Sequence, residues 1–240
     1  MDFVLHNPHS ILAILKTRPS DVLQIHCPQK EGIWGEIAHF AQKFSIAVAS
    51  PQRKNFKKNT PSRLNSNFAW VREKSSVCLS TLFDHNQPKS IYLALDCLQD
   101  PYNVGSIFRT AAFFGIKGIL LTQERSVQLT AQVYEAASGG IEWVPFSLQT
   151  NLSQALKVAK KSGIWILGSS VHEGEKWTRI PRDRSWMLIL GNEHQGIRHL
   201  TQKNCEMLCK IPSQSSINSL NVAVAAGILM AHLTQVEKES

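Results

Sequence analysis

From Ser90 onward, short apolar runs alternate regularly with amphipathic stretches, and this alternation restricts the possible folds more than any other feature of the sequence. It predicts strands at 91–96, 118–121, 143–146, 164–169 and 186–191, and helices at 104–114, 130–138, 151–163 and 220–233. Strands separated by helices pair in parallel, with helices on both faces of the sheet and ligand sites beyond the carboxyl ends of the strands. The sequence therefore predicts an α/β domain whose functional residues lie at strand-to-helix junctions.

A smaller α/β unit precedes this domain. Apolar runs at 22–25 and 46–49 predict short strands, and apolar residues recur at helical spacing over 33–44. The polar segment at 75–88 ends in Gln-Pro-Lys and is typical of a linker. We therefore expect an N-terminal domain at 1–74, a linker at 75–88 and a C-terminal domain at 89–240.

The net charge of +8 favours a polyanionic partner. Between Glu36 and Glu73 there is no acidic residue, and basic residues gather in a segment rich in Asn and Pro at 51–63. Such a run is often only a solvated loop, but Phe56 adds a ring that can stack on a base while the cations screen phosphates. The expected RNA-binding residues are Arg53, Lys54, Phe56, Lys57, Lys58 and Arg63.

Several other classes of protein are disfavoured. The five cysteines are odd in number and show no C-x-x-C spacing, which argues against a disulfide framework and a zinc site. No window holds the ~18–20 uninterrupted apolar residues of a membrane helix. G-x-G-x-x-G and P-loop motifs are absent. We expect a cytoplasmic protein that binds no metal and does not associate with a membrane.

The first junction, at 93–116, places a turn at Asp100-Pro101 and a helix after Asn103. Asn103 can be read simply as a helix cap. Arg109 lies farther along the helix, but helical side chains lean toward the N-terminus, so its guanidinium can reach back toward the junction. An anion-binding site at this edge of the sheet is the functional alternative.

Two further junctions carry polar residues. At 186–200, Gly191 and Gly196 flank a turn containing Glu193, and the lack of Cβ atoms would let a ligand approach the main chain. At 209–233, Ser219 is the expected N-cap of the last helix, which leaves Asn221 without a capping role. An ordinary turn and an ordinary cap are the structural alternatives.

Together, the motifs D-P-Y-N-V-G-S-I-F-R-T-A, G-N-E-H-Q-G and I-P-x(6)-S-L-N-V resemble, in this order, the signature motifs of the SpoU (TrmH) family of RNA 2′-O-methyltransferases in the SPOUT superfamily. The resemblance covers nearly all of residues 90–240, and the N-terminal domain is similar to the family's L30e-like substrate-binding domain. It implies a deep trefoil knot, S-adenosylmethionine as cofactor, an RNA substrate, and a homodimer formed through the knotted domain with residues of both subunits at the site.

The resemblance also implies roles for individual residues. The catalytic set falls on Asn103, Arg109, Glu193, Ser219 and Asn221. Main chain at Gly191, Ile211 and Leu220 matches the positions that hold the cofactor.

The length and the N-terminal domain favour 23S ribosomal RNA as substrate over transfer RNA, which stays an alternative. Ser213 and Ser215 stand where the family usually has Met and Gly, so a non-catalytic RNA-binding or ribosome-assembly protein on the same fold is a second alternative. An unrelated nucleotide-binding α/β enzyme is the third.

Overall fold

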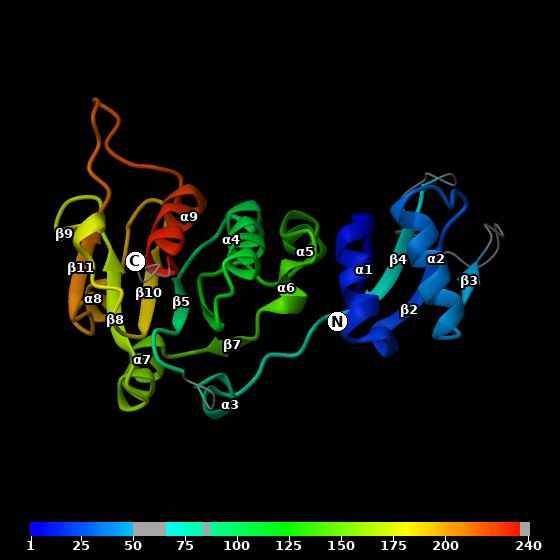
Figure 1. Cartoon of the computed structure of the whole chain (residues 1–240), viewed down its shortest axis with the longest axis horizontal. Coiled ribbons are helices and arrows are strands. Elements are labelled where there is room, and N and C mark those ends of the chain that lie inside the picture. The colour runs from blue at the N-terminus through cyan, green and yellow to red at the C-terminus, as the bar shows by residue number, and fades with distance from the viewer. Residues whose placement is uncertain (50–65, 84–86, 236–240) are drawn as a thin grey trace, which may run out of the picture.

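A computed structural model describes residues 1–49, 66–83 and 87–235 of the chain (Figure 1). The described residues form a four-stranded and a seven-stranded sheet, each with its own helices. None of the described helices is long and apolar enough to cross a membrane.

The small sheet belongs to the N-terminal domain and has the order β1-β4-β2-β3. Its elements are β1 (Asp2–Leu5), α1 (Pro8–Thr17), a 3-10 turn (Pro19–Asp21), β2 (Val22–His26), α2 (Ile33–Lys43), β3 (Val48–Ala49) and β4 (Phe68–Arg72). β1 and β2 both run antiparallel to β4. Asn7 caps α1 by accepting from the amides of His9 and Ser10, and Pro8 occupies the first turn, where its missing N–H costs nothing.

The large sheet is entirely parallel and has the order β7-β6-β5-β10-β8-β11-β9. Its strands are β5 (Ile91–Asp96), β6 (Gly118–Thr122), β7 (Phe146–Gln149), β8 (Trp165–Ser169), β9 (Glu175–Lys176), β10 (Trp186–Gly191) and β11 (Met207–Lys210). The helices are α3 (Leu79–Phe83), α4 (Pro101–Phe113), α5 (Ala131–Ala137), α6 (Gly140–Trp143), α7 (Leu152–Lys161), α8 (His199–Gln202) and α9 (Val222–Leu233), with a 3-10 turn at Trp177–Arg179. This confirms the predicted fold class.

Alternate residues of the central strands pack on opposite faces of the large sheet. Leu93 and Leu188 belong to the apolar cluster that includes α4, α5 and α9, whereas Ala94 and Ile189 belong to the cluster that includes α3 and α7. Both faces are therefore covered, which explains why these strands read as continuous apolar runs.

One predicted strand is displaced. The segment 143–146 was expected to be extended, but β7 begins only at Phe146. Pro145 has no N–H to donate to a neighbouring strand, and the preceding residues form α6 after Gly139, which has a positive φ of 91°.

The order of the C-terminal strands makes the chain cross β8 once between β9 and β10 and again between β10 and β11. β10 lies between β5 and β8, β11 lies on the far side of β8, and α9 returns to pack against α4 and β10. The trefoil knot implied by the resemblance stays a prediction, because strand order alone does not describe threading.

The segment expected to be a linker is partly structured. It contains α3, whose Leu82 and Phe83 are buried in the apolar cluster on the α7 face of the large sheet. The amide of Val77 donates to the carbonyl of Phe146, and Ser147 Oγ donates to the carbonyl of Val77. The division of the chain into domains stays a prediction, but this segment is anchored to the C-terminal sheet.

The two sheets are joined by an interface between α1 and the helices α5 and α6 (Figure 1), where the rings of Phe3 and Tyr134 lie 4.9 Å apart. It is called the polar interface here because it also holds buried charged groups. Arg18 donates from Nε and Nη2 to the two carboxylate oxygens of Glu142, at 2.8 and 2.9 Å, and the Glu142 side chain is 1% exposed. Burial lowers the pKa of Arg18, but the hydrogen bond and charge of Glu142 outweigh burial, and the net shift is upward. Arg18 therefore stays charged and paired with Glu142 inside the interface.

Lys74 and Tyr134 complete this interface. Lys74 Nζ donates to the carbonyl oxygens of Ile141 at 2.7 Å and Glu142 at 3.0 Å, at the end of α6. The Lys74 amide donates to the hydroxyl oxygen of Tyr134 at 2.9 Å, and Ser10 Oγ donates to the Tyr134 carbonyl. Burial lowers the pKa of Lys74 and raises that of Tyr134. The N-terminal domain is therefore docked by directional contacts.

Candidate active site

Three predicted residues meet at the carboxyl edge of the large sheet. Asn103 Nδ2 donates to Glu193 Oε1 at 3.1 Å, and Asn221 Nδ2 donates to Asn103 Oδ1 at 2.9 Å. Asn103 is buried on α4, Glu193 follows β10, and Asn221 precedes α9. Because β5 and β10 are adjacent parallel strands, the segments that follow them meet at one edge. The three motifs thus form one hydrogen-bonded chain of side chains.

The structure corrects two predicted caps. Asp100, not Asn103, caps α4 by accepting from the Tyr102 amide, so Asn103 falls within the first turn. Asn221, not Ser219, caps α9 by accepting from the amides of Ala223 and Val224. Asn221 therefore both caps a helix with its carbonyl oxygen and donates to Asn103 with its amide nitrogen.

The turn after β10 has little room for side chains. A Cβ on Gly191 would lie 2.2 Å from the carbonyl carbon of Gly196, which itself has a positive φ of 67°. Asn192 holds the turn by accepting from the amides of His194 and Gln195 and by donating to the carbonyl of Cys97. The two glycines are thus needed for the conformation that presents Glu193.

An ion pair with a buried carboxylate supports the far end of this turn. Arg198 Nε lies 2.7 Å from Asp96 Oδ1, and the Arg198 amide donates to Asp96 Oδ2 at 3.1 Å. The Asp96 side chain, at the end of β5, is fully buried, while Arg198 is partly exposed. Two hydrogen bonds to one carboxylate fix the segment after Ile197 relative to the sheet.

A cavity of about 640 Å³ opens beside these residues. Six of the predicted site residues line it, and these are Gly191, Glu193, Ile211, Ser219, Leu220 and Asn221. Asn103 contacts two of them without lining the cavity. The predicted cofactor-binding positions and most of the predicted catalytic positions therefore share one cavity.

The loop after β8 also lines this cavity, and sequence reasoning missed it. Its lining residues include His172 and Glu173, and Glu173 Oε1 accepts from Gln202 Nε2 at 2.7 Å. The signal was present, because β8 is a predicted parallel strand whose carboxyl end lies at the same edge as that of β10.

The altered loop between β11 and α9 projects away from the body of the molecule (Figure 1). Both serines make hydrogen bonds within the loop. Ser213 Oγ donates to the Ser215 carbonyl at 3.0 Å, and the Ile217 amide donates to Ser215 Oγ. Neither serine lines the cavity. The departure from the family motif therefore does not fill the predicted cofactor site.

Cys209 is the thiol in the cavity lining, and Cys205 is close to it. Burial raises the pKa of Cys209 to about 12, and burial together with Glu206 raises that of Cys205 to about 12. Both cysteines are therefore protonated near neutral pH, and neither is set up as a nucleophile.

Arg109 is apart from the other predicted catalytic residues. It is exposed on α4 and does not line the cavity. On the same helical face lie Tyr102, seven residues before Arg109, and Phe113, four residues after it. The exposed fraction is 62% for Tyr102 and 83% for Phe113. A single chain therefore does not bring Arg109 to its own cavity.

The predicted RNA-binding residues, Arg53, Lys54, Phe56, Lys57, Lys58 and Arg63, lie outside the described residues. Their role stays a prediction.

Residues 90–231, well over half of the chain, match the family described as the SpoU rRNA Methylase family. A protein of Bacillus subtilis (strain 168) described as a TrmH family tRNA/rRNA methyltransferase is 32% identical over 198 residues, which cover 81% of this chain and 80% of that protein. The 23S rRNA (guanosine-2′-O-)-methyltransferase RlmB of Nitrosomonas europaea is 36% identical over 152 residues, which cover 63% of this chain and 58% of that protein.

Solved structures share the fold over nearly the whole chain. The SpoU methyltransferase AviRb from Streptomyces viridochromogenes, in complex with AdoMet, superposes with a TM-score of 0.78 at 17% identity, covering 97% of this chain and 89% of that one. An AdoMet-bound rRNA methyltransferase from Sinorhizobium meliloti superposes with a TM-score of 0.76 at 22% identity, covering 97% and 86%. The likeness therefore extends to the N-terminal domain.

Proposed function

The chain belongs to the SpoU rRNA methylase family, and from this membership we propose that it methylates a ribose 2′-hydroxyl of 23S ribosomal RNA. It is an S-adenosylmethionine-dependent RNA methyltransferase. The proposal depends above all on the hydrogen bonds that join Asn103, Glu193 and Asn221 beside the cavity.

The cavity fits the cofactor. Its volume of about 640 Å³ lies within the roughly 300–1,000 Å³ of small-molecule sites. Its lining combines apolar side chains, including Leu208 and Leu229, with residues of the segments that follow β10 and precede α9. Gly191, Ile211 and Leu220 would hold S-adenosylmethionine, which supplies a methyl group on a positively charged sulfur.

The chain's own residues then act on the ribose. A 2′-hydroxyl is a poor nucleophile at neutral pH, so it must be held in line with the methyl group and helped to lose its proton. A guanidinium donates hydrogen bonds and does not accept protons, so Arg109 would bind a phosphate of the RNA and stabilise negative charge on the ribose oxygen. The released proton would pass to a phosphate or to water. Glu193, Asn103, Ser219 and Asn221 would orient the ribose through hydrogen bonds.

The position of Arg109 supports a homodimer in which each site uses residues of both subunits. Arg109 lies between the exposed rings of Tyr102 and Phe113. α9, which packs against α4, contains no Lys, Arg, Asp or Glu, and its Val224 is 51% exposed. Exposed apolar surface of this kind is typical of an interface. A partner that covers this face would receive Arg109 at its own cavity.

Two relatives bear on the substrate. The Nitrosomonas europaea protein is named for guanosine 2′-O-methylation of 23S rRNA, and the Bacillus subtilis protein is described with both tRNA and rRNA. Ribosomal RNA is therefore the substrate we propose, and transfer RNA is the alternative. Ser213 and Ser215 do not line the cavity, which disfavours the alternative of a non-catalytic protein.

The test begins with calorimetric titration of the purified chain with S-adenosylmethionine and S-adenosylhomocysteine. Labelled methyl transfer is then measured on 23S ribosomal RNA and on transfer RNA from cells that lack this gene, and the methylated ribose is mapped. Saturable binding with ribose methylation of 23S RNA supports the proposal. Methylation of transfer RNA alone would select the alternative, and absence of cofactor binding with RNA present would favour a non-catalytic RNA-binding protein.

A further inference from the structure

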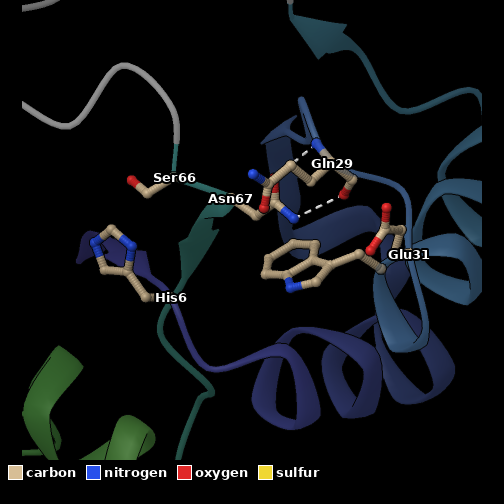
Figure 2. Close-up of a pocket in the computed structure, with 6 residues that line it drawn as sticks. His6, Gln29, Glu31, Ser66 and Asn67 are labelled. Carbon is tan, nitrogen blue, oxygen red and sulfur yellow. Dashed lines mark hydrogen bonds between the residues drawn. The ribbon is translucent and has the colours of Figure 1, made fainter.

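A second cavity, here called the N-terminal pocket, lies in the N-terminal domain (Figure 2). Its volume is about 380 Å³. It is lined by His6, Gln29, Glu31, Trp34, Ser66 and Asn67. Because β1 and β2 both run antiparallel to β4, the residues after β1 and β2 and those before β4 meet at one edge of the small sheet. The topology thus gathers side chains from separate segments.

We propose that the N-terminal pocket binds one unpaired base of the RNA substrate, an inference that rests on the proposed function. Two rings line the pocket, and aromatic side chains that stack on unpaired bases are the usual means of holding single-stranded RNA. Trp34 is half-buried and packs against the apolar core, so its indole is held in place. The His6 ring is exposed and lies 5.9 Å from the ring of Phe68.

The pocket is preformed on one side. Asn67 Nδ2 donates to the Gln29 carbonyl at 2.8 Å, and Asn67 Oδ1 accepts from the Gln29 amide at 3.2 Å. Figure 2 shows these two bonds, with His6 and Glu31 toward opposite ends of the pocket. Asn67 therefore holds the segment before α2 in place, and a ligand need not order it.

Three further polar groups of the pocket are available to a ligand. Among the residues that the structure describes, the Glu31 carboxylate, the Gln29 side-chain amide and the Trp34 indole N–H have no hydrogen-bond partner. A carboxylate accepts two hydrogen bonds side by side, and the Watson–Crick edge of guanine offers two adjacent donors. We therefore expect guanine to bind better than adenine.

The N-terminal pocket is tied to the catalytic domain but separate from its cavity. The His6 amide donates to the Glu135 carboxylate of α5, and Asn7 Nδ2 donates to the Glu135 carbonyl at 2.9 Å. α5 in turn packs against α4. In Figure 1, α4, α5 and α6 lie between this domain and α9. The base held here is therefore a recognition nucleotide, and its own ribose is not the one methylated by the same chain.

The test uses the full chain and fluorescein-labelled uridine nonamers with a central guanine, adenine or abasic site, with affinity measured by fluorescence anisotropy. The wild-type chain should bind the guanine nonamer about tenfold more tightly than the abasic one. Trp34→Ala should abolish this difference and Trp34→Phe should keep most of it. Glu31→Gln should remove only the preference for guanine over adenine. His9→Ala, an exposed change on α1 outside the pocket, is the matched control.

Equal affinity of the wild type for guanine and abasic nonamers would overturn the proposal. A folded Trp34→Ala chain that still prefers the guanine nonamer to the abasic one would also count against this pocket. So would a Glu31→Gln chain that still prefers guanine to adenine. Calorimetry with S-adenosylmethionine on the same preparations separates the two hypotheses. A wild-type chain that binds the cofactor but does not discriminate between the nonamers refutes only the base-binding role of the pocket. A wild-type chain that does not bind the cofactor refutes the proposed function on which that role rests.

Discussion

The surface of the C-terminal domain that meets the N-terminal domain differs in chemistry from the outer face of α4 and α9. At the first, charges are buried and paired, as in the contact of Arg18 with Glu142 and of Lys74 with the end of α6. At the second, Phe113 and Val224 are large, apolar and exposed. The first surface is complete within one chain.

The difference indicates two kinds of association. Buried ion pairs are costly to desolvate and are tolerated only with good geometry, so they are typical of a contact with one fixed arrangement. An exposed apolar face lowers the free energy when another protein surface covers it. We infer that the polar interface sets the arrangement of the domains and that the apolar face is left for a second copy.

The largest expected effect is on the rate of methyl transfer, through Arg109 on the outer face of α4. Arg109→Ala should lower the rate of methyl transfer by about 10²–10³-fold, because it removes a donor to developing charge. Cofactor affinity, measured by calorimetry, should be unchanged, because the proposed contacts of Arg109 are with the RNA and not with the cofactor. Co-expression of Arg109→Ala and Glu193→Ala chains with different tags tests whether the site is shared.

In such a mixture, half of the dimers combine the two variants, and each of these has one intact site, so about one quarter of wild-type activity should return. A mixture no more active than its parents would mean that Arg109 serves the cavity of its own chain.

The next largest effect is on the stability of the polar interface. Glu142→Ala should lower the free energy of unfolding by about 3 kcal/mol, because Arg18 loses both carboxylate acceptors of Glu142 and is left with its ion pair to Asp21. Urea unfolding followed by circular dichroism measures this. Glu142→Leu combined with Arg18→Met should recover much of the loss, since the buried carboxylate and its guanidinium partner are then removed together.

The control is Glu175→Ala, which removes an exposed pair with Arg179 at 3.9 Å and should change stability by less than about 0.5 kcal/mol. Equal losses for Glu142→Ala and Glu175→Ala would mean that the interface is not a structural contact in solution.

A smaller effect is expected on association. Phe113→Asp should weaken the dimer by about 2 kcal/mol, because a charge replaces a ring that is 83% exposed in the single chain. Sedimentation velocity over a range of concentrations measures the shift toward monomer. Phe44→Asp, a similar change in the N-terminal domain, should leave the association state unchanged. Monomeric wild-type protein would contradict the proposed dimer.

The smallest effect concerns one hydrogen bond of the polar interface. Tyr134→Phe should lower the free energy of unfolding by about 1–2 kcal/mol, because the Lys74 amide loses its acceptor while the ring packing stays. Differential scanning calorimetry measures the change. A Tyr134→Phe chain as stable as the wild type would show that water replaces the hydroxyl and that the interface is wetter than its contacts indicate.

The catalytic edge could be predicted from the sequence because its residues follow recognisable parallel strands. Asn103 and Glu193 come after β5 and β10, and strand adjacency alone brings them together. Ser219 and Asn221 were also placed near the right junction, but the cap was assigned to the wrong residue. Local sequence permits either cap, and only the contact of Asn221 with Asn103 distinguishes them.

The N-terminal domain was less predictable. β1 and β4 were missed because each is short and they pair across more than sixty residues, which leaves no local pattern. Arg18, Lys74 and Glu142 look like ordinary surface charges in the sequence. Their burial depends on the docking of two domains, which neither periodicity nor composition describes.

We expect the docked domains to act as a gauge of length for an RNA that contacts both of them. Because Glu142 and Lys74 join α6 to the N-terminal domain by directional bonds, an RNA that touches both domains must present its two contact points at one fixed separation. Stems that are one turn too short or too long would miss one contact, whatever their sequence. Selection by size can therefore precede any reading of bases.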